Sequence, residues 1–383
     1  MSEIISVDYV AEHIKELVDD GYQLCIWGTE EKAAKLGVVL LGKCGVPIQC
    51  YCDEREEKWG KEIVKDKFCI APDELKRNAD NYICVVMVND VDTLETVERL
   101  RSWGVKYCCG FYDLLCSEYA LHCFYPFTAE PQSNPHANRI PRSSNNYMFH
   151  GIENRIAVYT CVIGGYDNVY DPQIPEDNCD YYIISESKPK NISVYQWIPL
   201  DTLDIPMDLN NVLINRFCKI NAHKMFPQYK YSIYIDGNIE LKRKISNAFL
   251  KKLEGKVTGI ACKKRNCKIA DVYRDGIHVI VSRLADEIKV QKQMEQYWKE
   301  GLPEYHGQIA GNIWVREHNN PACIRIMEEW WNQISTQAPR DQLSFMYAVW
   351  KNGYCFDDIG ILDVGGWHNE TYDAWKHVKG YGK

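Results

Sequence analysis

The sequence predicts an α/β protein with two domains. Its 383 residues are too many for one ordinary hydrophobic core, and 46% of them are hydrophobic against 26% charged, the balance of a globular chain. Short apolar runs typical of strands alternate with amphipathic, helix-like segments in both halves. Between the halves, residues 121–154 hold four prolines among Asn, Ser and Gln without a hydrophobic period, so we expect a linker there.

The first domain, residues 1–120, shows a β-α-β alternation typical of a parallel, doubly wound sheet. Strands are predicted at 23–28, 46–52 and 82–88, and helices at 6–20, 32–41 and 92–103. This order resembles the start of a Rossmann domain, but Glu30 and Ala33 occupy positions where the dinucleotide fingerprint has glycines. Because Glu30 and Glu31 would repel a pyrophosphate, we expect a degenerate domain with a scaffolding, docking or regulatory role.

The second domain, residues 155–383, is predicted to be a second α/β unit. Its strands are expected at 155–163, 180–185, 231–235, 257–261 and 278–281, and its helices near 283–299, 321–334 and 341–351.

Charge and cysteine usage narrow the class of protein. A net charge of −8 argues against a nucleic-acid partner, although residues 256–268 contain a local basic patch that fits a diphosphate or an anionic surface. The 17 cysteines lie mostly inside apolar runs and lack zinc-site spacing, so we expect buried, unpaired thiols. Without a signal-peptide pattern or a membrane-length apolar run, we expect a cytoplasmic protein.

One motif predicts a metal site. In Tyr234-Ile-Asp-Gly-Asn238, a hydrophobic strand ends in two oxygen-bearing side chains, Asp236 and Asn238. Side chains at the carboxyl end of such a strand face the crevice where α/β sheets bind ligands, and hard cations such as Mn²⁺ or Mg²⁺ prefer oxygen ligands. Asn238 adds no charge, so it should bind metal more weakly than a carboxylate. The alternative is an ordinary turn after a strand.

A second motif, Arg340-Asp-Gln-Leu-Ser-Phe345, opens a predicted helix. We expect Asp341 to face the substrate sugar as a catalytic group, with Arg340 and Gln342 orienting the same substrate. The alternative is structural, because Asp341 would also serve as a helix N-cap.

The last residues offer a third motif, His377-x-x-Gly380-x-x-Lys383. The imidazole of His377 is a candidate third metal ligand, Gly380 would let the backbone approach a diphosphate, and Lys383 would balance charge on the leaving group. The alternatives are a frayed chain end and His368 as a rival ligand. Further donor-binding candidates are Arg216 and Lys219, which would reach phosphates unless they form a solvated helix face, and Glu186 for the nucleobase or ribose.

Residues 155–360 resemble a glycosyltransferase-like family known from plant mucilage synthesis and from bacteria, long classed as a domain of unknown function. The matching runs are Thr160-Cys-Val-Ile-Gly-Gly-Tyr-Asp167, Arg216-Phe-Cys-Lys219 with His223, Tyr234-Ile-Asp-Gly-Asn238, Tyr297 to Pro303, Arg316-Glu-His-Asn319, Trp330-Trp331 and Arg340-Asp-Gln-Leu-Ser-Phe345. The resemblance implies a GT-A fold, a nucleotide-diphosphate sugar donor such as a UDP-sugar, and a divalent metal. It adds Thr160, Gly164 and Tyr166 to the donor-binding candidates.

The tail also resembles the His-x-x-Gly-x-x-Lys ending of glycogenin-like retaining transferases. That resemblance implies a metal-ligand role for His377 and a diphosphate contact for Lys383. Asn238 stands where those enzymes carry an aspartate, which weakens the expected metal binding.

The leading hypothesis is a metal-assisted, retaining glycosyltransferase that moves a sugar to a glycan or lipid-linked acceptor in surface-polysaccharide biosynthesis. The alternatives are a non-catalytic nucleotide-sugar-binding or assembly protein and a hydrolase on the same fold. The same hypothesis allows peripheral association with the inner membrane, a polysaccharide-assembly complex and a homo-oligomer.

Overall fold

The computed structural model describes residues 5–88, 90–125, 127, 155–190, 192–265 and 268–378. The chain divides into two compact units, Met1–Glu130 with Gly276–Arg283, and Pro131–Asp275 with Leu284–Lys383. Most of the predicted linker at 121–154 lies outside the described residues, so its boundaries stay a prediction.

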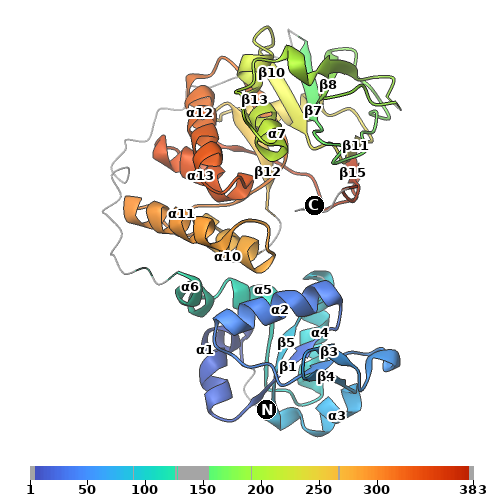
Figure 1. Cartoon of the computed structure of the whole chain (residues 1–383), viewed down its shortest axis with the longest axis vertical. Helices are drawn as coiled ribbons and strands as arrows, with labels where there is room; N and C mark the ends of the chain where they lie inside the picture. Colours follow the sequence, from blue (N-terminus) through green and yellow to red (C-terminus); the bar gives the residue numbers. More distant parts are fainter. Residues whose placement is uncertain are drawn as a thin grey trace. The chain divides into compact units, whose positions relative to one another are not determined.

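The first unit is built on a six-stranded sheet in the order β3-β4-β2-β1-β5-β6 (Figure 1). Strand β1 pairs in parallel with β2 and β5, and β5 with β6. The strands are β1 Gln23–Trp27, β2 Cys50–Cys52, β3 Glu62–Val64, β4 Lys67–Ile70, β5 Tyr82–Val86 and β6 Tyr107–Gly110. The helices are α1 Val7–Asp19, α2 Glu31–Lys43, α3 Pro72–Arg77, α4 Asp90–Ser102, α5 Phe111–Leu115 and α6 Glu118–Phe124. The predicted parallel sheet is therefore confirmed for β4, β2, β1, β5 and β6, while the edge strand β3 pairs antiparallel with β4.

The turn after β1 is occupied by side chains of the protein itself. Asp53 accepts hydrogen bonds from the backbone N–H of Thr29 (3.0 Å) and from Arg55 Nε (2.8 Å). Arg55 also reaches Glu30 Oε1 at 2.7 Å. These bonds outweigh the desolvation that would raise the pKa of Asp53 and hold that pKa well below its usual range. The acidic residue after the second strand thus has its oxygens committed within the unit.

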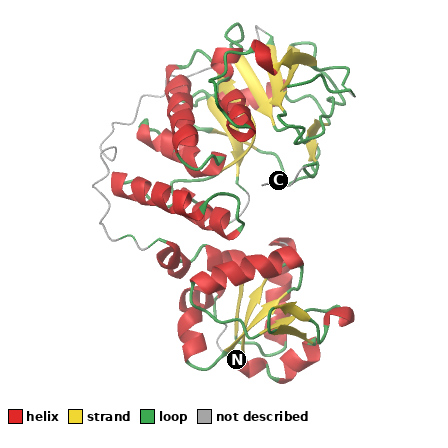
Figure 2. Cartoon of the chain, in the orientation of Figure 1, coloured by secondary structure: helices red, strands yellow, loops and turns green. Residues whose placement is uncertain are grey.

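The second unit is built on a mixed seven-stranded sheet in the order β14-β12-β13-β10-β7-β8-β9 (Figures 1 and 2). Strands β10, β7, β8 and β9 run in parallel, and β13 is antiparallel to both β10 and β12. A two-stranded sheet joins β11 to β15. The strands are β7 Ile156–Cys161, β8 Cys179–Ser185, β9 Gln196–Pro199, β10 Tyr231–Ile235, β11 Ile239–Leu241, β12 Ile260–Lys264, β13 Ile309–Glu317, β14 Gly360–Leu362 and β15 Tyr372–Ala374.

Helices α7, α12 and α13 pack with the strands that carry the candidate site: α7 contacts β7 and α12, and α13 contacts α12 and β13. The helices of this unit are α7 Asn211–Ile220, α8 Ala222–Met225, α9 Ser246–Leu250, α11 Glu287–Glu300, α12 Pro321–Thr336 and α13 Asp341–Lys351. Helix α10, Val272–Val281, contains residues of both units. The α/β class predicted for this half is confirmed.

One prediction from hydrophobic patterns was wrong, and several strands were not predicted, including a long one. The apolar run at 278–281 was expected to be a strand, but it is the last turn of α10, because a short buried run has no period that separates strand from helix. Strand β13 was missed altogether, although its nine residues form the antiparallel member of the large sheet.

The predicted thiol environment is borne out where the structure describes it. Cys25, Cys84, Cys161 and Cys218 are all buried, and the described cysteines are free rather than disulfide-bonded. No helix within the described ranges is both long and apolar enough to cross a lipid bilayer.

Candidate functional site

Asp236 lies directly after β10, where the predicted motif begins. Its backbone N–H donates to the carbonyl of Asn312 at 2.9 Å, which extends the pairing of β10 with β13 by one residue. The side chain is 28% exposed, so its carboxylate can reach a ligand. The sheet therefore fixes the backbone of the motif while leaving the Asp236 side chain accessible.

Gly237 is enclosed by its neighbours. A Cβ atom at this position would clash with Val162 Cγ2 and lie 3.2 Å from Asp167 Cβ. The motif therefore requires glycine for close packing against the segment that follows β7. Asp167 is consequently part of the same site, although its sequence context did not predict a site role for it.

A buried lysine joins two of the predicted motifs. Lys219 on α7 has a side chain that is only 1% exposed, and its Nζ lies 3.1 Å from Asp236 Oδ1 and 2.6 Å from Asp341 Oδ2. Arg216, one turn earlier on α7, places Nε 2.7 Å from Asp341 Oδ1. Residues from α7, the end of β10 and the start of α13 thus form one charged network.

Asp341 is the first residue of α13 rather than its N-cap, and Arg340 takes the cap position without a side-chain capping bond. Burial would raise the pKa of Asp341, but the charges of Arg216 and Lys219 outweigh burial and lower it. The structural alternative of a capping aspartate is therefore wrong, and the carboxylate is held ionised among cations.

Asn238 connects the motif to the segment after β15. Its side-chain amide donates to the carbonyl of Trp375 at 2.6 Å, and the Trp375 N–H donates back to the Asn238 carbonyl at 2.9 Å. Strands β11 and β15 continue this pairing from Ile239 opposite Ala374 (Figure 1). A residue near the end of the chain is thereby fixed beside a motif that lies 137 positions earlier.

His377 folds against the site instead of fraying. Its Nδ1 lies 2.6 Å from Asp167 Oδ1, and its ring lies 4.7 Å from that of Tyr166. The Asp167 hydrogen bond raises the pKa of His377 against the opposing effect of burial, and the charge of Asp236 contributes in the same direction. Gly380 and Lys383 lie outside the described residues. The rival ligand, His368, pairs with Asp373 at 3.1 Å.

These groups suit a hard cation in their chemistry, although they do not form a complete cage. Among the described residues, no three His, Cys, Asp or Glu side chains are grouped as metal ligands. The predicted set contains two such residues, Asp236 and His377, with the Asn238 amide as the third donor. Because Asp167 engages Nδ1 of His377, the ring is oriented as in a carboxylate–histidine–metal arrangement, in which Nε2 is the ligand atom.

The predicted donor-binding residues of β7 and β8 lie at the ends of adjacent parallel strands. Glu186 Oε1 accepts the backbone N–H of Gly164 at 2.7 Å. Thr160 is buried on β7, and its hydroxyl finds no hydrogen-bond partner among the described residues. The structure thus brings Gly164 and Glu186 together, while their contact with a donor stays a prediction.

Arg340 and Gln342 are placed by a buried polar cluster. The side-chain amide of Gln308 donates to Asp275 Oδ2 at 2.9 Å and to the carbonyl of Gln342 at 3.0 Å. Burial raises the pKa of Asp275, and the charges of Arg265 and Arg340 act against that effect. Gln308 and Asp275 thereby support the first turn of α13, from which Asp341 extends.

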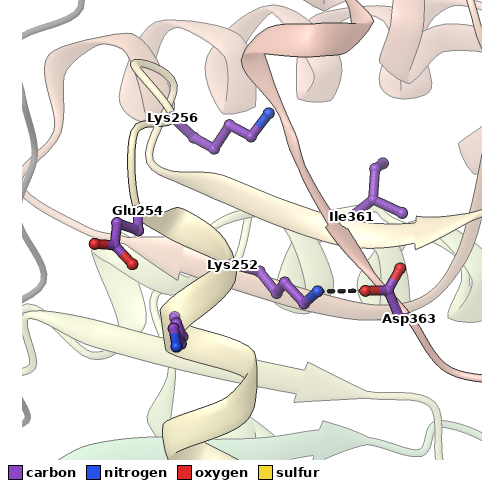
Figure 3. A pocket seen from close by; sticks show the side chains of 6 residues that line it. Lys252, Glu254, Lys256, Ile361 and Asp363 are labelled. Carbon is purple, nitrogen blue, oxygen red and sulfur yellow. Dashed lines mark hydrogen bonds and ion pairs between the residues drawn. The ribbon is translucent and has the colours of Figure 1, made fainter.

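Two lysines of the basic segment predicted at 256–268 are engaged by partners within the protein rather than left for an anion. Lys263 is buried and donates to the Tyr372 hydroxyl at 2.8 Å, and Lys256 donates to the carbonyl of Asp357 at 2.7 Å. A separate pocket of about 710 Å³ lies beside η4 (Lys251–Leu253) and β14. Figure 3 shows Lys252 pointing toward Asp363, with which it forms an ion pair. Lys256 of the basic segment lines this pocket, but none of the predicted catalytic, donor-binding or metal-binding residues does.

Several solved glycosyltransferase structures resemble part of the chain at low sequence identity. The apo bifunctional glycosyltransferase WbbM matches at 12% identity, with 55% of this chain and 39% of that chain covered and a TM-score of 0.33. The mannosyltransferase Ktr4p from S. cerevisiae matches at 9% identity over 54% of this chain and 68% of its own, with a TM-score of 0.30. The galactosyltransferase LgtC, solved with donor and acceptor sugar analogues, matches at 7% identity. The match covers 54% of this chain and 72% of that chain, with a TM-score of 0.31.

A curated relative is the probable hexosyltransferase MUCI70 of Arabidopsis thaliana, 24% identical over 221 residues. The match takes in 50% of this chain but only 36% of the plant protein. The model of the TOD1/MUCI70 glycosyltransferase-like domain matches residues 112–355, which include Asp167, Lys219, Asp236 and Asp341 and end before His377. Because that match spans well over half of the sequence, the chain belongs to the TOD1/MUCI70 glycosyltransferase-like domain family.

Proposed function

We propose that this protein is a glycosyltransferase that moves a sugar from a nucleotide-diphosphate donor, a UDP-sugar, to a glycan or lipid-linked acceptor. The observation that carries the proposal is the placement of Lys219 between Asp236 and Asp341, with Asn238 and His377 in the same region. Family membership supports the same reaction class.

In this proposal, Asp236, Asn238 and His377 hold Mn²⁺ or Mg²⁺. The cation would neutralise the donor diphosphate and lower the energy of the departing nucleotide. Asp167 orients the imidazole of His377 through the 2.6 Å hydrogen bond to Nδ1. Arg216 and Lys219 add positive charge close to the leaving group, with Lys383 in the same role.

Asp341 faces the donor sugar. Since its pKa is lowered, the carboxylate stays ionised at neutral pH and can stabilise positive charge that develops at the anomeric carbon. Arg340 and Gln342 orient the sugar from the same turn of α13. The tail resemblance supports retention of anomeric configuration, which NMR of the freshly formed product would test.

The experiment measures donor hydrolysis and transfer across a panel of nucleotide sugars, with Mn²⁺ or with EDTA, in the wild-type protein and in Asp236→Ala. We expect turnover that needs the metal and falls at least about a hundredfold in the variant. Asp201→Ala is a suitable control because Asp201 is exposed in η3, Leu200–Thr202. Undiminished turnover in Asp236→Ala would remove the proposed site.

A second candidate function is non-catalytic binding of a nucleotide sugar. It is favoured by the Asn238 amide in place of a carboxylate and by the engagement of Asp236 Oδ1 with Lys219. Calorimetry that detects donor binding, together with no turnover over a broad acceptor panel, would support this function over transfer.

A further inference from the structure

One face of the small β11–β15 sheet combines an exposed aromatic ring with polar side chains. The buried face carries Ile239, Leu241, Tyr372 and Ala374, which belong to the hydrophobic core of the second unit. Because side chains alternate along a strand, the partners Glu240 and Asp373 point to the other face. Trp375, which is 39% exposed, and His368 continue that face.

The aromatic part of this face is fixed before any ligand arrives. The ring of Trp375 lies 5.8 Å from that of Tyr170 and 5.6 Å from that of His368. Trp375 Nε1 donates to Glu240 Oε2 at 3.2 Å, and the Trp375 backbone is bonded in both directions to Asn238. A ring held in this way loses little conformational entropy when a ligand stacks on it.

Polar groups lie beside two of these rings, since Glu240 contacts Trp375 and Asp373 contacts His368. Glu240 Oε1 accepts from the Gln173 amide at 2.9 Å, and Asp373 Oδ1 lies 3.3 Å from Lys242 Nζ. A sugar ring presents an apolar C–H face bordered by hydroxyl groups, so it needs an aromatic plane with hydrogen-bonding groups at its edge. The β11–β15 face provides both.

We infer that this face, made by Trp375, Tyr170, His368, Glu240 and Asp373, is a sugar-binding platform for the acceptor glycan. Its position beside Asn238 puts it next to the proposed donor site, so the inference rests on the proposed function for the identity of its ligand as acceptor. A second protein copy fits less well, because stable protein interfaces have depleted charge at their centre and this face carries several charged groups.

The charges also select among sugars. Glu240 and Asp373 contribute two carboxylates and Lys242 one ammonium group, so carboxylates outnumber the ammonium group on this face. A uronic acid would meet repulsion there, whereas a neutral pyranose would meet hydrogen-bond acceptors for its hydroxyl groups. The platform should therefore prefer neutral glycans over acidic ones.

The test is a calorimetric titration of the full chain with cellohexaose and with hexagalacturonate, supported by saturation-transfer NMR. No nucleotide sugar or metal is added, so the result is independent of donor turnover and separates failure of the platform from failure of the proposed reaction. We expect cellohexaose to bind, and Trp375→Leu to weaken its binding about tenfold, the value of losing one stacked ring. Trp375→Phe should restore most of the affinity, and hexagalacturonate should bind about tenfold more weakly.

The matched control is Trp59→Leu, which changes a tryptophan of similar exposure (37%) in the other unit and should leave binding unchanged. If thermal melting shows that Trp375→Leu does not fold, Tyr170→Leu tests the same stack. The inference is overturned if the wild type binds no cellohexaose at about 10 mM, or if the folded variants bind as the wild type does. A change of oligomeric state in light scattering of Trp375→Leu would overturn it in favour of a protein partner.

Discussion

Lys219 and Asp341 lie 122 positions apart in the sequence, yet their side chains meet at 2.6 Å in the interior of the second unit. Each is nearly inaccessible to solvent, with side-chain exposures of 1% and 5%. Two charges in such a place stabilise each other only as a pair, because either one alone would be a desolvated ion. Asp236 and Arg216 complete the network, which links the site's charge to the packing of α7 and α13.

Asp341→Asn should therefore affect both stability and activity. Removing the carboxylate leaves Lys219 and Arg216 with less negative charge in a buried place, so we expect unfolding to become easier by about 3 kcal/mol. Donor turnover should fall at least about a hundredfold, because the group that we propose to face the sugar loses its charge. Urea unfolding and steady-state kinetics measure the two effects.

The double variant Lys219→Met/Asp341→Leu separates these effects. It removes both ions of the pair, so we expect it to recover part of the lost stability without recovering turnover. Asp201→Asn, on the surface, serves as the control for loss of a carboxylate. If Asp341→Asn has the same free energy of unfolding as the wild type, the charged network does not stabilise the fold.

Gly237→Ala tests the close packing of the proposed metal-binding motif. The added Cβ would clash with Val162 and crowd Asp167, and overpacking of this kind typically costs about 1–3 kcal/mol. We expect a lower melting temperature and reduced donor turnover, because Asp236 and Asn238 flank the displaced residue. Val162→Ala in the same chain should restore part of the loss. Gly366→Ala, where the added atom meets nothing within 4 Å, is the control.

Asp167→Asn tests the orientation of His377. The amide keeps the size of the side chain but weakens its hydrogen bond to Nδ1, and losing such an outer carboxylate typically lowers metal affinity about tenfold or more. We expect a corresponding rise in the Mn²⁺ concentration that half-saturates the protein. Mn²⁺ binding followed by electron paramagnetic resonance measures it without relying on turnover. Equal affinity in the two proteins would show that Asp167 does not act through His377.

The strands and helices near the site were predictable where hydrophobic periodicity is strong. The apolar run at 231–235 placed Asp236 at a strand end, and β10 has those same bounds. The heptad-like apolar positions of 341–351 predicted α13 with its observed limits. Local patterns were sufficient here because each element buries a recognisable face.

The contacts that organise the site were not predictable in the same way. Nothing in the local sequence around Lys219 indicates that its ammonium lies between Asp236 and Asp341 instead of in solvent. Strands β11 and β15 are three residues each, too short for a period, yet their pairing brings Trp375 to Asn238. The one sequence feature that marks Asp167 is its place at the end of the Gly-Gly-Tyr-Asp run. Its role beside His377 is visible only in the structure.

A buried histidine gives the fold a testable pH dependence. His318 Nδ1 lies 3.1 Å from the Phe226 carbonyl, which can only accept, so Nδ1 carries the proton and Nε2 accepts from the Ser232 hydroxyl at 2.8 Å. Burial, assisted by the charge of Arg316, lowers the pKa of His318 to about 3. The folded protein therefore keeps this ring neutral.

Between the folded-state pKa of about 3 and an unfolded value of about 6.5, the unfolded chain binds the proton more readily, so stability falls as pH falls. The slope for one histidine is about half its limit at pH 6.5 and approaches about 1.4 kcal/mol per pH unit below it, so the loss between pH 6.5 and 5.0 is about 1.6 kcal/mol. The variant His318→Gln should be less stable than the wild type at pH 7. On acidification, its free energy of unfolding should fall by less than that of the wild type, and the difference should equal the contribution of His318. Urea midpoints at the two pH values measure the difference, and parallel losses in both proteins would rule out His318 as its source.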